Sequence, residues 1–143
     1  MPASAPLHLV KLAVGVTDPA HLARLQAARA AADPPLRHLT RHLPRRAAEI
    51  TAAGSIYWVI GGLLLVRQRI FAIRPVTRAD GTPAAALELD PALHPLAPRA
   101  MAPFQGWRYL AAADAPPDLD PRAAAPDALP ATLAAELRRL GLL

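Results

Sequence analysis

The chain has 143 residues and a net charge of +5, with 16 lysine and arginine side chains against 11 acidic ones. This length suits one domain with a hydrophobic core of its own. The chain contains no cysteine, which excludes disulfide scaffolds, cysteine-based zinc sites and cysteine nucleophiles.

From the sequence we expect neither a leader peptide nor a membrane-spanning segment. No basic stretch at the N-terminus precedes a long apolar run, so we expect no secretory signal. The longest apolar run covers residues 56–66, which is shorter than the roughly 20 residues that a membrane helix needs. We therefore expect a cytoplasmic protein that does not contact a membrane.

The first two predicted elements are a strand and a helix. Alternating aliphatic residues predict a strand over residues 7–14. Thr17 or Asp18 can cap a helix that begins at Pro19 and ends near residue 32, before two prolines. Gln26 is expected on its exposed side. The apolar stripe is formed by Leu22, Leu25, Ala28 and Ala32.

A short strand within residues 36–43 is predicted to lead into a helix over residues 44–53. Arg45 and Arg46 would then lie in its first turn. Gly54 would follow its last turn with a positive φ, which glycine adopts at little cost.

Two apolar strands, residues 56–60 and 63–73, are predicted to form a hairpin around Gly61-Gly62. Because paired residues share a face of a sheet, this loop places Ile60 opposite Leu63, Trp58 opposite Leu65 and Ile56 opposite Arg67. Arg67 and Arg69 would share the face of Trp58, and Gln68 the face of Tyr57. Both faces are apolar near the turn, so we expect a central hairpin that is buried on both sides.

The remaining chain predicts an Asp80-Gly81 turn, a strand and a proline-rich edge or loop. These last two segments cover residues 84–90 and 94–103. We expect one domain over residues 1–113, a Pro- and Asp-rich linker over 114–130, and a helix within 131–143 that packs back on the domain. Helices and strands are mixed along the chain without a regular βαβ alternation, which indicates an α+β fold. Its mostly antiparallel sheet would close toward a barrel, with two or three flanking helices.

Positive charge is concentrated in the middle of the chain. Residues 37–78 carry eight arginines against one acid, a net charge of +7, whereas residues 79–143 carry five arginines against eight acids, a net charge of −3. This pattern indicates either a surface that faces a polyanion or an ordinary solvated face. Guanidinium groups beside aromatic rings suit phosphate and base recognition. The candidate nucleic-acid or anion-binding residues are Arg41, Arg45, Arg46, Arg67, Gln68, Arg69, Tyr57 and Trp58.

A second aromatic segment, Phe-Gln-Gly-Trp-Arg-Tyr-Leu, covers residues 104–110. Its aromatic rings either pack on the hairpin as core or line a pocket. The candidate pocket residues are Gln105, Trp107, Arg108 and Tyr109. His38 and His42 have the spacing of a helical metal pair, but no third ligand is evident. We assign no metal, cofactor or catalytic residue.

The segments PLHLVKLAVGV, RHLTRHLPRR, GSIYWVIGGLLLVRQRI and FQGWRYL resemble the domain-of-unknown-function family numbered 1489, found in alphaproteobacteria. The resemblance implies a cytoplasmic single-domain protein and no particular activity. The order of elements resembles the pseudobarrel of PUA and ASCH domains, which commonly bind RNA or modified bases. The Gly-x-Lys-x-x-x-x-Arg signature of ASCH domains is absent after Gly54.

These observations leave three hypotheses open. The first is a non-enzymatic module that binds RNA or a nucleotide through the arginine and aromatic residues named above. The second is a protein-interaction or ribosome-associated module that uses the acidic C-terminal third. The third is a small-molecule enzyme with a pocket near residues 105–109.

Overall fold

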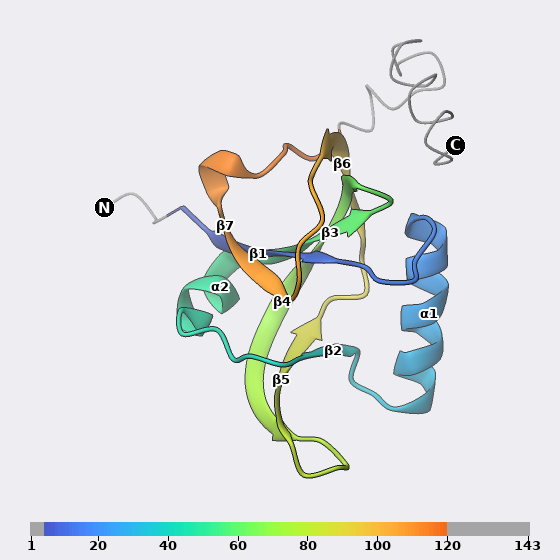
Figure 1. Ribbon diagram of the computed structural model, residues 1–143, viewed down its shortest axis with the longest axis vertical. Coiled ribbons are helices and arrows are strands. Elements are labelled where there is room, and N and C mark those ends of the chain that lie inside the picture. Colours follow the sequence, from blue (N-terminus) through green and yellow to red (C-terminus); the bar gives the residue numbers. More distant parts are fainter. Residues whose placement is uncertain (1–4, 120–143) are drawn as a thin grey trace.

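The computed structural model describes residues 5–119. Most of the expected linker and all of the expected C-terminal helix lie outside this range. Figure 1 shows two helices beside a strongly curved sheet. The hairpin formed by the strands β4 and β5, within residues 63–89, projects away from the helices. The elements are β1 (Leu7–Leu12), α1 (Pro19–Ala32), β2 (Arg37–Thr40), α2 (Ala47–Ala53), β3 (Ser55–Ile60), β4 (Leu63–Thr77), β5 (Pro83–Leu89), β6 (His94–Ala100), β7 (Trp107–Ala111) and the short 3-10 turn η1 (Ala112–Asp114).

The strands form one mixed sheet in the order β2-β5-β4-β3-β1-β7, with β6 paired to β4. Only β1 and β3 run parallel, and the other printed pairs are antiparallel. The α+β class and the mostly antiparallel sheet are therefore confirmed. Within residues 5–119, β2 and β7 are edge strands that do not pair with each other. The sheet is open there, so the expected barrel closure is not found.

The central hairpin is buried on both sides, as predicted. Every residue of β3 is buried. One face packs Ile56, Trp58 and Ile60 against Leu22 of α1 and Ile50 of α2. On the other face Tyr57, Val59 and Leu64 pack with Leu96, Phe104 and Leu110. β3 and the first half of β4 thus form the middle layer of the protein.

The turn prediction is confirmed, but the register prediction fails two residues from the turn. Gly61 and Gly62 have φ of 60° and 84°, as the turn at a two-residue hairpin requires. Ile60 pairs with Leu63 and Val59 with Leu64, but Trp58 pairs with Val66. Leu65 is therefore an extra residue in β4, which makes a β-bulge.

The bulge exchanges the faces of the outer half of β4. Because side chains alternate along a strand, one extra residue moves each following side chain to the opposite face. Gln68 lies beside Trp58 and accepts a hydrogen bond from its Nε1 at 3.1 Å. Arg67 lies opposite Tyr57, the reverse of the arrangement we expected.

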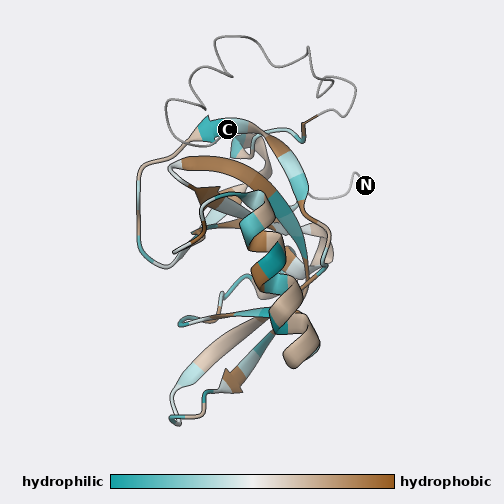
Figure 2. Ribbon diagram, turned by 90° about the vertical axis from the view of Figure 1, so that its right-hand side faces the viewer, coloured by the Kyte–Doolittle hydropathy of each residue, from teal (hydrophilic) through white to brown (hydrophobic). Residues whose placement is uncertain are grey.

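Helix α1 has the predicted ends but a different buried side. The Asp18 carboxylate accepts the His21 N–H at 2.8 Å and caps the helix. The buried side chains are Leu22 and Gln26, so the exposed position predicted for Gln26 is wrong. Figure 2 shows strongly hydrophilic and strongly hydrophobic residues next to each other in one half of α1 and mildly hydrophobic residues in the other half. No helix within residues 5–119 is long and apolar enough to cross a membrane.

Helix α2 begins later than predicted and ends at Ala53 as predicted, but the backbone conformation of the residue that follows is different. Arg46 is its N-cap residue, so Arg45 and Arg46 precede the helix instead of forming its first turn. Gly54 has φ −87°, and the positive φ predicted for it is wrong. A Cβ at Gly54 would overlap the carbonyl oxygen of Leu7 and lie 2.6 Å from that of Ile50. Glycine is required there because two backbones approach each other.

Candidate functional site

The arginines in the part of β4 beyond the bulge, where we expected an exposed basic patch, are bound to other parts of the protein. Arg67 makes a bidentate ion pair with Asp118 at 2.6 and 2.7 Å and donates to the Ser55 hydroxyl at 3.0 Å. Arg69 donates to the carbonyl of Thr51 at 2.7 Å and to that of Gly54 at 2.9 Å. Free carbonyls at the end of a helix suit such a cation. Both guanidinium groups therefore have structural partners.

The other three candidates on the hairpin are buried. Trp58 is 2 % exposed, Tyr57 4 % and Gln68 0 %. Buried side chains cannot stack on a base at the surface. The structure therefore does not bring Trp58 or Gln68 to a common surface with the arginines.

Two candidate segments distant in sequence do meet: the stretch that precedes α2, and β7 with the residues just before it. They surround an open cavity of about 500 Å³. This cavity joins the arginine stretch to the aromatic segment, which the sequence showed only as separate features. It is lined by His42, Leu43, Arg45, Gln105, Gly106, Trp107 and Tyr109.

Hydrogen bonds hold the two walls of this cavity together. Trp107 Nε1 donates to the His42 carbonyl at 2.9 Å, although the two residues are 65 positions apart. The Arg46 N–H donates to the Tyr109 hydroxyl at 3.1 Å. The rings of Trp107 and Tyr109 meet edge to face, with centroids 5.0 Å apart. The aromatic pair is thus fixed in place and has little side-chain freedom left to lose on binding.

The arginines near the cavity differ in whether they form ion pairs. Arg46 makes a bidentate pair with Glu49, with both N···O distances 2.7 Å, and its guanidinium lies 5.6 Å from the centre of the Tyr109 ring. Arg41 and Arg45 are exposed and form no ion pair within residues 5–119. Arg108, a candidate pocket residue, does not line this cavity, because its guanidinium stacks 4.5 Å from the centre of the Phe104 ring.

The charge of the middle segment is partly offset by nearby acids. Three of its arginines pair with acids from outside the segment: Arg37 with Asp33, Arg67 with Asp118 and Arg74 with Glu88. Arg46 pairs with Glu49. The net charge of +7 counted along the chain therefore overstates the positive surface that the fold presents. Among the described residues, Arg45 is the arginine without an ion pair that lines the cavity of the aromatic pair.

A third group of polar side chains lies at the other end of β1 and β3. His8, Tyr57, Arg67 and Asp118 line a cavity of about 370 Å³. The ring of His8 packs edge to face on Tyr57, and its Nδ1 accepts the Ser55 N–H at 2.9 Å. Burial, with smaller contributions from Arg67 and Arg69, lowers the pKa of His8 to about 4. Burial likewise lowers the pKa of His38 to about 4, helped by Lys11 and Arg29.

These two histidines predict a loss of stability in mild acid. Their folded-state pKa of about 4 lies below the ordinary histidine pKa of 6.5. The unfolded chain therefore binds more protons between those pH values, and the free energy of unfolding falls as the pH falls from about 6.5 to about 4. Urea denaturation at several pH values measures the slope. His8→Asn, whose amide oxygen can accept the Ser55 N–H, should reduce it, whereas the exposed His42→Gln should not. A slope unchanged by His8→Asn would contradict the prediction.

No group of three metal-ligating side chains occurs in the part of the chain that the structure describes. Leu43 lines the cavity beside the aromatic pair although we did not single it out, and His42, which we considered only as half of a metal pair, lines it as well. No sequence signal marks either residue for this cavity, because their position follows from the contact between the 41–46 segment and β7.

Comparisons with known proteins give one match. Residues 9–143 match the family described as "Protein of unknown function (DUF1489)". No curated protein and no solved structure matches the chain.

Proposed function

We propose that this chain, which belongs to the DUF1489 family of proteins of unknown function, binds single-stranded RNA at the cavity between β7 and the segment that precedes α2. The observation that carries the proposal is the meeting of Arg45, which has no ion-pair partner within residues 5–119, with a fixed aromatic pair around one open cavity. The proposal rests on this cavity and not on a pseudobarrel, because the described sheet is open.

The aromatic pair supports recognition of unstacked bases. Tyr109 is 37 % exposed and Trp107 is partly exposed. A base from a single strand can stack on such a ring, which contributes about 1–3 kcal/mol per base. Gln105 is exposed on the same rim, and its amide can both donate to and accept from a base edge. Bases inside a duplex are not available for these contacts.

The charge of the lining supports a polyanion. The described cavity wall contains no carboxylate, and Arg45 is one of its members. Arg41 is exposed on the same segment. Pro44, which lies between Arg41 and Arg45 along the chain, is fully buried and anchors this segment to the core. A guanidinium group next to a stacking platform, with a second one four residues earlier on the same segment, matches a base and its flanking phosphates.

The first test measures RNA affinity across a salt series by fluorescence anisotropy of a labelled oligouridylate. Each phosphate contact on a single strand contributes about 0.7 to the slope of log affinity against log salt. Arg41→Ala and Arg45→Ala should each weaken binding by about threefold to tenfold and reduce the slope by about that amount. Arg78→Ala is the matched control, because Arg78 is exposed in the β4–β5 turn and does not line the cavity.

A second readout uses the tryptophans. The chain has two, and Trp58 is buried, so quenching by RNA should come from Trp107 and vanish in Trp107→Phe. Unchanged quenching in that variant, or equal losses in Arg45→Ala and Arg78→Ala, would overturn the proposal. Affinity that is insensitive to salt, or equal affinity for a hairpin RNA, would also contradict it. Binding only to a partner protein would favour the interaction-module alternative.

A further inference from the structure

A separate pair of adjoining cavities lies between α1 and the strands β1 and β2. The larger has a volume of about 460 Å³ and is formed by the end of α1 and by β2. The smaller, about 120 Å³, is mostly apolar. Arg29, Arg37 and His38 line both, so the cavities meet at these three side chains.

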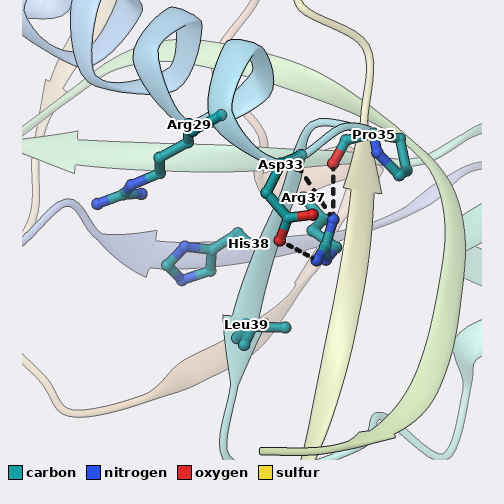
Figure 3. Close-up of a pocket in the computed structure, with 7 residues that line it drawn as sticks. Arg29, Asp33, Pro35, Arg37, His38 and Leu39 are labelled. Atoms are coloured by element: carbon teal, nitrogen blue, oxygen red, sulfur yellow. Dashed lines mark hydrogen bonds and ion pairs between the residues drawn. The ribbon is translucent and has the colours of Figure 1, made fainter. Parts of the chain in front are cut away.

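The cations at this junction are of two kinds. Arg37 is held by the Asp33 carboxylate at 2.6 Å and the Pro35 carbonyl at 3.1 Å. In Figure 3 it folds against those residues, whereas Arg29 and His38 extend to the same side of the pocket. Arg29, and Lys11 in the wall of the smaller cavity, have no carboxylate partner within residues 5–119. After the Asp33–Arg37 pair is counted, the two cavities together therefore keep two positive charges without a counter-ion.

His38 gives a second, independent indication of a ligand site at this junction. Its Nε2 is buried and has no hydrogen-bond partner among the described residues. An unpaired buried polar atom costs free energy, so each one in a native structure calls for a reason. The ring is held edge to face against Trp58, with centroids 5.1 Å apart. A hydrogen-bonding group on a bound ligand would give this nitrogen the partner that the protein does not supply.

The smaller cavity specifies what else the ligand carries. Its wall contains Leu12, Val16, Leu22, Leu25 and Trp58. This part of the wall favours an apolar group, which a free inorganic ion does not carry. A ligand that fills both cavities must therefore combine a compact apolar body with an anionic group.

We infer that these cavities bind a small organic anion. Its charged group lies beside Arg29, Lys11 and His38, and its apolar body enters the smaller cavity against Leu25 and Trp58. The site is distinct from the proposed RNA-binding cavity, because the two share no lining residue.

The test is an NMR titration of the isotope-labelled full chain with phenyl phosphate. We expect dissociation constants in the millimolar range or tighter. Backbone shifts should map to residues 29–38 and the imidazole nitrogens of His38 should shift. Inorganic phosphate lacks the apolar body and benzyl alcohol lacks the charge, so each should bind at least about tenfold more weakly.

Arg29→Met and Lys11→Met should each weaken phenyl phosphate binding by about tenfold. Arg24→Met is the matched control, because Arg24 is exposed on the same helix and lines neither cavity. Arg29 is also exposed, so its replacement leaves the core unchanged. No shifts at about 10 mM ligand, equal effects of Arg24→Met and Arg29→Met, or equal binding of benzyl alcohol or inorganic phosphate would overturn the inference. Arg45→Ala should leave this binding intact, which separates it from the RNA proposal.

Discussion

Replacing Gly54 with alanine is expected to lower the free energy of unfolding by about 3–5 kcal/mol, or to prevent folding altogether. Gly54 joins α2 directly to β3, with no loop between them. Its N–H donates to the Ile50 carbonyl at 2.6 Å, and its own carbonyl accepts the Ile70 N–H at 3.1 Å. A methyl group here would meet the backbone carbonyls of Leu7 and Ile50.

The size of this effect follows from what would have to move. Both obstructing atoms belong to backbone, and a carbonyl cannot turn away as a flexible side chain can. Relief requires β1 to separate from β3, or α2 to shift, and either movement disturbs the core around Ile50 and Ile56. The penalty is steric, since φ at Gly54 is ordinary for any residue.

Gly15→Ala provides the control for Gly54→Ala. Gly15 has φ +79° and no atom within 4 Å of an added Cβ, so it tests conformational strain without a clash, at a cost of about 1–2 kcal/mol. Urea denaturation followed by circular dichroism measures both variants. If Gly54→Ala costs no more than Gly15→Ala, the close approach of β1 to the end of α2 is not what requires glycine.

Local signals in the sequence predicted the elements well. Asp18-Pro19 marks the start of α1, and Gly61-Gly62 marks the hairpin, because each acts on its own neighbours along the chain. The bulge at Leu65 could not be predicted in this way. Residues 63–66 are all apolar, so either register buries apolar side chains on both faces and the pattern does not choose between them.

The candidate site was predictable in its parts but not in its assembly. The arginine stretch and the aromatic segment stand out by composition, yet they meet because β1 pairs with both β3 and β7. That pairing carries β7 alongside the chain that follows β2. For Arg67 and Arg69 the error is the opposite one, because we expected both side chains to be available for a ligand. Their partners, Asp118 and the end of α2, are distant along the chain and could not be recognised from neighbouring residues.

Gln68→Leu is expected to cost about 3 kcal/mol of the free energy of unfolding. The Gln68 amide makes four hydrogen bonds in a buried position. Its Oε1 accepts from Gln26 Nε2 at 2.9 Å and from Trp58 Nε1 at 3.1 Å. Its Nε2 donates to Gln26 Oε1 at 2.7 Å and to the Asp90 carbonyl at 2.8 Å. Leucine is of similar size, so the loss is one of hydrogen bonds and not of volume.

The companion substitution Gln26→Leu should cost less, about 1–2 kcal/mol, because Gln68 then keeps its bonds to Trp58 and Asp90. The double variant should be more stable than the sum of the single losses predicts, with a coupling of about 1–2 kcal/mol. This follows because each single change leaves the other amide buried and unpaired, and the double change removes both. Urea denaturation of the four proteins in the cycle measures the coupling, and Gln105→Leu, at an exposed position, controls for the substitution itself. Additive losses would show that the two amides do not form one network. In that case the bulge that brings Gln68 to the Trp58 face would not be needed to pair α1 with the sheet.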